Sequence, residues 1–314
     1  MKVSLPLLLM LCACRTPPAA PPPPVEAPPP RAVAKRSEPS RAVAVTLDDL
    51  PLGDIGRYTD DAERHRTVEK LAGLIKERRL PVTGFFIMSH HARHPSLLPV
   101  WRDAGVRLGN HTWSHPSPNR VSIETYLADL ERGHRAVAAL APPGGRVPFR
   151  HPYLDEGFLP EKRAAIQEKV RELGSVEVPV TIDTSDWLYA RGYLDARHQG
   201  DRRRAELYRR SWRWNIEEST LIAELLAREL FGREPPQILL LHANALNADH
   251  LGQALDWLAG RGYRFVSLEE ALADPAYREP DRSTSPTGDS RWLRLLRSRK
   301  LRRRGPLHKA EQPR

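Results

Sequence analysis

The sequence predicts an α/β fold in which parallel strands alternate with helices. Between residues 41 and 272, short apolar runs alternate with longer amphipathic segments. Alternation of this kind is typical of a parallel sheet or barrel whose strands are connected by crossover helices. A length of 314 residues suits one large domain with tails, and it is ample for a sizeable hydrophobic core.

Seven short apolar runs are the expected strands, and the amphipathic segments are the expected helices. The strands are expected at residues 42–47, 82–88, 106–109, 147–150, 176–182, 238–241 and 263–266. The helices are expected at residues 60–79, 96–104, 122–140, 160–173, 216–231, 249–260 and 268–272. The basic and aromatic segment 188–215 is expected to be either a substrate-selecting loop or an irregular surface excursion docked by its aromatic rings.

The N-terminus has the layout of a secretory signal. A short apolar run, Val3 to Leu11, follows Met1-Lys2 and is too short to span a bilayer. Leu11-Cys12-Ala13-Cys14 resembles a bacterial lipobox, so residues 1–14 are expected to be a signal peptide that makes Cys14 the lipidated first residue. The protein is therefore expected to be exported and anchored to a membrane of the bacterial envelope, in the periplasm or at the outer membrane.

Two further segments flank the expected folded domain, which covers residues 41–275. Residues 15–40 are rich in proline and favour polyproline II, as in a semi-rigid tether or a disordered leader. Residues 276–314 form a basic tail, expected to be disordered or partly helical. Residues 291–304 hold eight basic side chains and no acidic one, which suits either a solvated tail or a contact with anionic lipid or polymer. The net charge is +10, but no recognition module accompanies it, so no nucleic-acid partner is expected.

Polar residues follow the ends of five expected strands. Because the loops at the carboxyl ends of parallel barrel strands meet at one face, these residues are expected to build a common site. They are Asp48 and Asp49 after the first strand, His111 after the third, Arg150 after the fourth, Asp183 after the fifth and His242 after the sixth. Each alone has a plain structural explanation, such as a turn aspartate or a core histidine, but five strand ends together favour a site.

The segment Gly109 to His115 carries two histidines, His111 and His115, that are four residues apart. Both imidazoles can reach one point if the segment is helical or tightly turned. Two imidazoles and one carboxylate make a ligand set that suits a catalytic zinc with an open position. Of Asp48 and Asp49, one can supply that carboxylate and the other a base for water. With both cysteines in the N-terminal segment, the zinc is not expected to use thiolate ligands.

Five blocks of the sequence resemble, in order, the motifs of the polysaccharide deacetylases of carbohydrate esterase family 4, the NodB-homology domain. The blocks are Thr46–Asp49, His111–His115, Arg150–Tyr153, Asp183–Trp187 and Leu240–His242. The resemblance implies a distorted, incomplete (β/α)7 barrel. It also implies a metal-dependent enzyme, for which Zn²⁺ fits the ligands best and Co²⁺ or Ni²⁺ are admissible.

The resemblance assigns roles to the residues of the first three blocks. Asp49, His111 and His115 are expected to bind the metal, and Asp48 to act as the general base. Arg150 is expected to pair with Asp48 and keep it ionised, because a nearby cation favours the charged form of a carboxylate.

The resemblance also assigns roles to residues expected to contact the leaving group and the acetyl group. Tyr153 is expected to help hold the oxyanion through its backbone N–H. His242 is expected to protonate the leaving group, and either Asp183 or Asp186 to orient it. Trp187 and Leu240 are expected to wall an apolar acetyl pocket.

The expected function is hydrolysis of acetyl groups from an N- or O-acetylated polysaccharide of the cell envelope or its surroundings. Peptidoglycan is the nearest polymer for a tethered enzyme, while chitin oligomers, xylan and exopolysaccharides remain open. Two other functions stay in view, since fold does not determine function. One is hydrolysis of a non-sugar amide, and the other is a non-catalytic, glycan-binding lipoprotein of the envelope.

Overall fold

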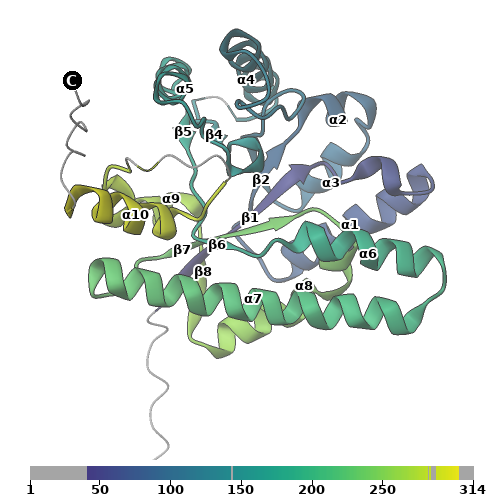
Figure 1. Ribbon diagram of the computed structural model, residues 1–314. Helices are drawn as coiled ribbons and strands as arrows, with labels where there is room; N and C mark the ends of the chain where they lie inside the picture. Colours follow the sequence, from purple (N-terminus) through teal and green to yellow (C-terminus); the bar gives the residue numbers. More distant parts are fainter. Residues whose placement is uncertain (1–40, 143, 282, 284–287, 304–314) are drawn as a thin grey trace, which may run out of the picture. The chain divides into compact units, whose positions relative to one another are not determined.

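The computed structural model describes residues 41–142, 144–281, 283 and 288–303 (Figure 1). Its centre is an eight-stranded sheet in which all ladders are parallel. The strands are β1 Arg41–Leu50, β2 Thr83–Phe86, β3 Arg107–Asn110, β4 Pro148–Phe149, β5 Val176–Glu177, β6 Ile182–Asp183, β7 Gln237–His242 and β8 Tyr263–Val266. The signal peptide, the lipidation of Cys14 and the proline-rich tether expected from the sequence lie outside the described residues.

The sheet curls around β1 but does not close. The strand order is β5-β4-β3-β2-β1-β7-β6, and β8 pairs with the first residues of β1 on the edge that β2 shares. The two outermost strands, β5 and β6, are consecutive in the chain and have no ladder between them within the described residues. This architecture confirms the predicted α/β fold with an incomplete barrel.

The single strand predicted at residues 176–182 is wrong, because this stretch crosses the gap between the two edges of the sheet. The N–H of Val178 donates to Phe149 O in β4 at 2.8 Å, whereas the N–H of Thr181 donates to Ile238 O in β7 at 3.0 Å. Pro179 lies between them and has no N–H to donate to a ladder. The stretch is therefore divided into β5 and β6, and we call residues 178–181 the seam.

Ten α-helices and three 3₁₀ turns are found among the described residues. The α-helices are α1 Asp61–Glu77, α2 Met88–Arg93, α3 Leu97–Asp103, α4 Ile123–Ala138, α5 Pro160–Glu172, α6 Asp186–His198, α7 Arg202–Phe231, α8 Ala245–Gly260, α9 Leu268–Leu272 and α10 Arg291–Arg303. The 3₁₀ turns are η1 Ile55–Arg57, η2 Pro152–Leu154 and η3 Pro275–Arg278. All seven predicted helices are confirmed, although α7 and α8 begin earlier than predicted, and α2, α6 and α10 were not among them.

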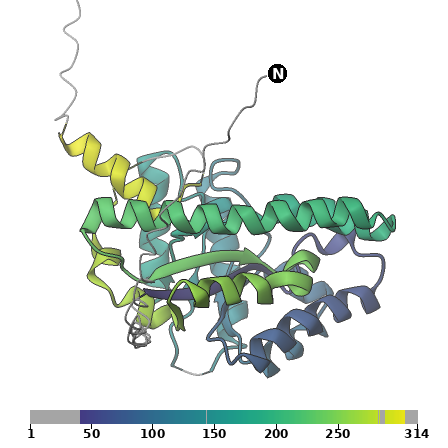
Figure 2. The ribbon, with the colours of Figure 1, turned by 90° about the horizontal axis from the view of Figure 1, so that it is seen from below.

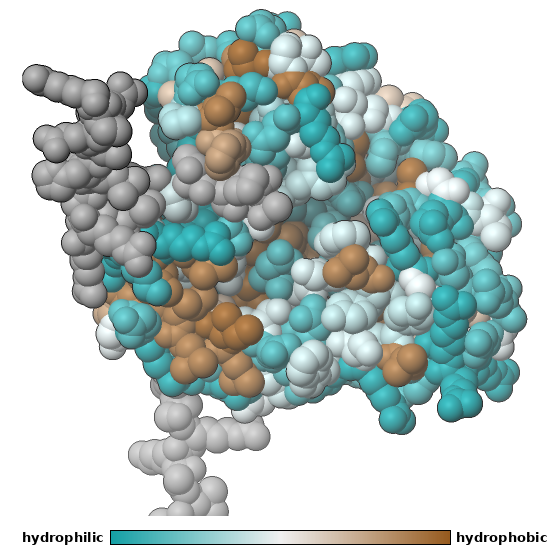
Figure 3. Space-filling view, in the orientation of Figure 1, coloured by the Kyte–Doolittle hydropathy of each residue, from teal (hydrophilic) through white to brown (hydrophobic). Residues whose placement is uncertain are grey.

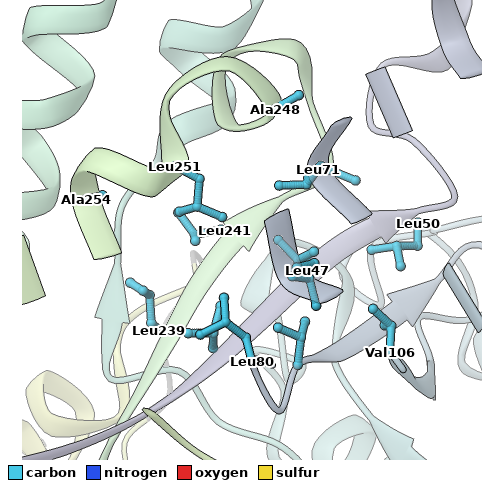
Figure 4. Close-up of a cluster of buried hydrophobic side chains, with 14 of the residues drawn as sticks. Leu47, Leu50, Leu71, Leu80, Val106, Leu239, Leu241, Ala248, Leu251 and Ala254 are labelled. Atoms are coloured by element: carbon cyan, nitrogen blue, oxygen red, sulfur yellow. The ribbon is translucent and has the colours of Figure 1, made fainter. Parts of the chain in front are cut away.

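The hydrophobic core lies between the sheet and the helices that follow its strands. Along β1, only Arg41 and Asp49 are not buried, as expected for a strand covered on both faces. Figure 4 shows leucines of β1 and β7 facing leucine and alanine side chains from α1 and α8. This packing fixes the central strands, whose carboxyl ends carry Asp48, Asp49 and His242.

The segment 188–215 is helical, which corrects the expectation of a loop or an irregular excursion. It forms most of α6 and the first half of α7, and these helices pack as a hairpin (Figures 1 and 2). Gly192 lies so close to the Tyr208 ring that a Cβ there would overlap it. Tyr193 and Trp212 are buried in the core, so neither can stack on a sugar.

The described part of the basic tail packs on the domain through α10, beside the C-terminal half of α7 (Figures 1 and 2). Trp292 is fully buried, makes an edge contact with Phe231 and donates from Nε1 to Gln237 Oε1 at 2.9 Å. Figure 3 shows an apolar patch over the same half of α7, where Ile222 and Leu225 are 50% and 63% exposed. Among the described residues, no helix is both long and apolar enough to cross a membrane.

Candidate active site

A pocket of about 540 Å³ opens at the carboxyl ends of the strands, where the sequence analysis expects the site. Residues at or just after the ends of six strands, β1, β2, β3, β4, β6 and β7, line it together with residues of α6. The curl of the sheet thus brings together side chains as far apart in the sequence as Asp48 and Asn244, which are separated by 196 positions. Nine of the eleven predicted site residues line this pocket: Asp48, Asp49, His111, His115, Tyr153, Asp183, Trp187, Leu240 and His242. The other two do not line it but bond to residues that do, Asp186 to His242 and Arg150 to Asp48.

Three side chains converge on one point of the pocket. Asp49 Oδ1 lies 3.6 Å from His111 Nε2 and 3.4 Å from His115 Nε2, and the two Nε2 atoms are 3.2 Å apart. Asp49 Oδ1 is buried and has no hydrogen-bond partner among the described residues. A buried carboxylate oxygen without a donor, facing two imidazole nitrogens, fits the ligand set of a divalent cation such as zinc.

A hydrogen bond to a backbone carbonyl orients the ring of His111. Its Nδ1 lies 2.8 Å from the carbonyl oxygen of Arg150, and because a carbonyl only accepts, Nδ1 carries the proton. Burial, and secondarily the neighbouring His115, lower the pKa of His111 well below its ordinary value, so the ring is neutral. Nε2 therefore presents a lone pair to the point where Asp49 and His115 converge, an arrangement typical of metal-binding histidines.

The loop that carries the two histidines is a tight turn rather than a helix. Thr112 and His115 adopt positive φ values of 66° and 63°. Inside the turn, the N–H of Thr112 donates to Asn110 Oδ1, and the N–H of His115 donates to Thr112 Oγ1, both at 2.9 Å. From α4, Asp129 Oδ1 accepts the N–H groups of Trp113 and Ser114 at 2.9 Å each. These bonds fold the loop so that both rings face Asp49.

Helix α4 can approach this loop closely because residue 133 is glycine. A Cβ on Gly133 would lie 2.5 Å from both Asn110 Oδ1 and the carbonyl carbon of Thr112. We therefore expect Gly133→Ala to lower the free energy of unfolding by about 1–3 kcal/mol through overpacking. We also expect it to weaken zinc binding, because α4 must move away from the histidine loop. Urea denaturation and zinc titration measure the two effects.

The control for this prediction is Gly73→Ala in α1. Gly73 is exposed, and a Cβ there would meet nothing within 4 Å. The same substitution should raise the free energy of unfolding by about 0.5–1 kcal/mol, because alanine is the better helix former. Equal stability changes in both variants would contradict the close approach at Gly133.

Asp48 is buried next to the candidate metal ligands and is paired with Arg150. Arg150 Nη1 lies 3.1 Å from Asp48 Oδ1 and 3.3 Å from Oδ2, while Nε donates to Val178 O at 2.8 Å and Nη2 to Thr46 Oγ1 at 3.1 Å. Burial raises the pKa of Asp48 to about 6, and the Arg150 guanidinium opposes that rise. Asp48 is thus a carboxylate with a pKa near neutrality, as general bases commonly have.

His242 at the end of β7 is paired with Asp186 and not with Asp183. His242 Nδ1 lies 2.6 Å from Asp186 Oδ1. The other oxygen of Asp186 accepts the backbone N–H of His242 at 3.0 Å and the side-chain amide of Asn244 at 2.9 Å. Burial alone would lower the pKa of His242, but the Asp186 carboxylate raises it to about 10. Asp183 instead accepts the N–H of Ser185 at 2.9 Å and shapes the turn before α6.

The walls of the pocket combine apolar and ionic contacts. Leu240 lies buried at its floor, whereas Trp187 and Tyr153 are 40% and 60% exposed at its mouth. The Tyr153 ring stands edge-on to the His115 ring, with centroids 4.5 Å apart. One rim is tied together by two ion pairs that the sequence analysis missed, Arg191 with Asp54 and Arg57 with Asp195.

Other functional residues were also missed, and their sequence signals differ. Asn244 and Asn247 follow His242 within the helix-starting run His-Ala-Asn-Ala-Leu-Asn, and the Asn247 amide donates to Asp186 Oδ2 at 2.5 Å. That run offers a signal, because asparagine is a common helix N-cap. Asp129 and Gly133 lie in mid-helix, and nothing local distinguishes them.

Parts of the sequence match known proteins. Residues 35–174 match the family model described as polysaccharide deacetylase. An uncharacterized 30.6 kDa protein of Geobacillus stearothermophilus is 24% identical over 239 residues, which cover 76% of this chain and 77% of that protein. Chitin deacetylase 3 of Cryptococcus neoformans is 34% identical over 107 residues, which cover 33% of this chain and 24% of that protein.

Solved structures share the fold. A pseudoenzyme of carbohydrate esterase family 4 from Bacillus anthracis superposes with a TM-score of 0.52 and 16% identity, covering 75% of this chain and 66% of that one. A polysaccharide deacetylase from Bacillus cereus superposes with a TM-score of 0.51 and 20% identity, covering 72% of this chain and 91% of that one. The protein is therefore an α/β protein with the incomplete barrel of these structures. Residues 35–174 thus match the polysaccharide deacetylase family, and the chain shares the fold of carbohydrate esterase family 4 structures.

Proposed function

We propose that this protein is a metal-dependent deacetylase that hydrolyses acetyl groups on a polysaccharide of the bacterial cell envelope. The observation that supports this proposal most strongly is the grouping of three functional units around one pocket. They are the ligand set of Asp49, His111 and His115, the buried Asp48–Arg150 pair and the His242–Asp186 pair. A glycan-binding protein without catalysis has no need of all three.

Asp49, His111 and His115 are the residues that would hold the cation, and zinc fits two imidazoles and one carboxylate best. Bound there, the cation supplies Lewis acidity, which polarises the acetyl carbonyl and lowers the pKa of a water molecule. The buried Asp49 oxygen, which lacks any other partner in the described chain, gains one when the cation binds.

Asp48 and His242 provide the proton transfers. Asp48 accepts a proton from the attacking water, and Arg150 keeps that carboxylate ionised and in place despite its burial. His242 carries a proton on Nε2 because Asp186 stabilises the imidazolium, and it donates this proton to the departing nitrogen or oxygen. The backbone N–H of Tyr153, at the pocket mouth, is assigned to the oxyanion. Leu240 and Trp187 give the acetyl methyl an apolar wall.

We also propose that the enzyme is exported and tethered to the cell envelope. The lipobox-like Cys14 and the proline-rich segment that follows it support a tethered, exported lipoprotein, and peptidoglycan is then the nearest acetylated polymer. The surplus of basic residues favours anionic glycans as substrates.

The experiment that tests the proposal is acetate release by the purified protein from peptidoglycan, chitin oligomers and acetylated xylan in parallel. Each reaction is run with zinc, after chelation, and after zinc is restored. We expect release from one polymer, its loss on chelation and its recovery with zinc. Because the three ligands lie at the end of β1 and in one loop of a domain that has its own hydrophobic core, we expect circular dichroism to show the fold intact without metal.

Three other outcomes would contradict or replace parts of the proposal. Acetate release that persists after complete metal removal contradicts the proposed ligand set. Release only from a small non-sugar amide replaces the polysaccharide with that substrate class. Binding to a polymer without any release, in the presence of bound zinc, indicates a non-catalytic glycan-binding protein.

A further inference from the structure

The C-terminal segment, which lies beyond the family match, reaches the active site from behind. Gly288 lines the catalytic pocket, and a Cβ there would overlap the carbonyl oxygen of Tyr153 and press on Leu154. Tyr153 belongs to the stretch from residue 151 to residue 159, which we call the Tyr153 loop. The backbone of the tail is therefore in direct contact with this loop.

An ionic cluster fixes the other side of the Tyr153 loop. Arg294 of α10 is buried, pairs with Glu156 through both terminal nitrogens, and lies 2.7 Å from Asp281. Arg163 of α5 joins the cluster with its own ion pair to Glu156 at 2.9 Å. Burial would raise the pKa of Glu156, but Arg294 overrides it and lowers that pKa to about 2. The Glu156 carboxylate is thus held ionised three residues from Tyr153.

Helix α10 also supports the seam of the barrel. The N–H of Arg291 donates to Val180 O at 2.6 Å, two residues from Val178, whose carbonyl accepts the Nε of Arg150. Arg291 and Arg294 of α10 line a small cavity at this seam together with Arg150. Buried Trp292 anchors the helix between these two contacts.

The Tyr153 loop therefore has two anchors. On one side, Asp155 accepts the hydroxyl of Ser117 at 2.6 Å and the amide of Asn119 at 2.7 Å, both from the stretch after the histidine loop. On the other side, Glu156 is held by Arg294 and Arg163. Without the Arg294 contact, Glu156 keeps only its ion pair with Arg163. A displacement of about 1 Å of a group that contacts the reacting atoms costs on the order of a hundredfold in rate.

We propose that Arg294 is a positioning residue which, from the C-terminal helix, holds the Tyr153 loop in its catalytic position. The proposal rests on the deacetylase function proposed above. It makes the basic tail a working part of the active site, because the loop that presents the Tyr153 N–H is clamped by a residue outside the region matched by the family model.

The test compares the full chain with its Arg294→Gln variant by kinetics and by hydrogen exchange. We expect kcat to fall on the order of tenfold to a hundredfold with KM nearly unchanged, because the loop acts on the transition state. Amide exchange at residues 152–158 should become faster, while exchange at 111–115 and zinc affinity stay the same. Arg294→Lys should recover part of kcat, since lysine keeps the charge but loses the two-pronged contact.

Two further variants make the test specific. Glu156→Gln weakens the same contact from the loop side and should give the same exchange pattern, so the test stands even if Arg294→Gln fails to fold. Arg297→Gln is the matched control, because Arg297 lies on α10 but is half exposed and pairs with Asp289. It should leave kcat and loop exchange unchanged.

The outcomes separate this inference from the proposed function. Faster exchange at 152–158 in Arg294→Gln, in a protein that releases no acetate, supports the positioning of the loop while the deacetylase function fails. Unchanged exchange and unchanged kcat in folded Arg294→Gln and Glu156→Gln overturn the inference. Equal losses of kcat in Arg297→Gln and Arg294→Gln also overturn it, because they indicate a general effect of loosening α10.

Discussion

Asp48→Asn is expected to lower kcat for acetate release by about 10²–10⁴-fold, the range that a lost general base commonly gives. The carboxylate lies beside the ligand set but is directed to Arg150, with both of its oxygens within 3.3 Å of Nη1. An asparagine in its place still offers one oxygen to Arg150 but cannot accept a proton. The substitution therefore removes the base and leaves the metal ligands unchanged.

Two measurements make this prediction specific. Zinc affinity should stay near that of the unchanged protein, because Asp49 and not Asp48 belongs to the ligand set. The melting temperature should fall, since a buried arginine that loses its paired carboxylate is destabilising. Acetate release close to that of the unchanged protein, with zinc bound, would show that another group takes the proton.

Asp186→Asn is expected to lower kcat for acetate release by about 10²-fold or more, because it removes a group that supports a catalytic acid. Asp186 is fully buried, and it is the reason that the pKa of His242 is raised to about 10. With a neutral amide in its place, burial lowers that pKa. The imidazolium then becomes scarce at neutral pH, and the leaving group must depart without its proton.

Asp183→Asn is the matched control for Asp186→Asn. The two aspartates are three residues apart, but the Asp183 carboxylate accepts its hydrogen bonds from Ser185 in the turn and, within the described part of the chain, forms none with His242. NMR titration of His242 in both variants tests the assignment directly. A lowered pKa in Asp183→Asn but not in Asp186→Asn would reverse the roles of the two residues.

The grouping of the three proposed metal ligands is predictable because it depends on short sequence patterns placed at strand ends. Asp49 ends a continuous buried strand, and His111 and His115 follow another strand four residues apart. Parallel strands carry their carboxyl ends to the same face, so the pattern alone brings the three side chains near one another. The choice between Asp183 and Asp186 was open because both follow the same strand, and only the start of α6 decides which one points at His242.

The helical hairpin of α6 and α7 could not be predicted from its composition. Its aromatic and arginine residues suggest surface recognition, yet Tyr193 and Trp212 face the core. Which rings are buried depends on the packing of α6 against α7 at Gly192 and Tyr208, residues that are 16 positions apart in the sequence.

The residues that shape the histidine loop were missed for a similar reason. Asp129 and Gly133 act through the position of α4 against the loop, and a helix interior gives no local sign of such a contact. Arg294 is hidden in the same way within a run of arginines, of which only some are buried. Tertiary packing, rather than local propensity, gives these residues their roles.

The metal site is tested most directly by counting zinc ions per chain in the purified protein and in Asp49→Ala, His115→Ala and Asp48→Asn, with acetate release measured on the same samples. We expect one tightly bound zinc in the unchanged protein and in Asp48→Asn, weak or no binding in the two ligand variants, and acetate release only in the unchanged protein. Zinc bound equally by Asp49→Ala and His115→Ala, or acetate release from a zinc-free sample, would contradict the claim that Asp49, His111 and His115 form the catalytic metal site.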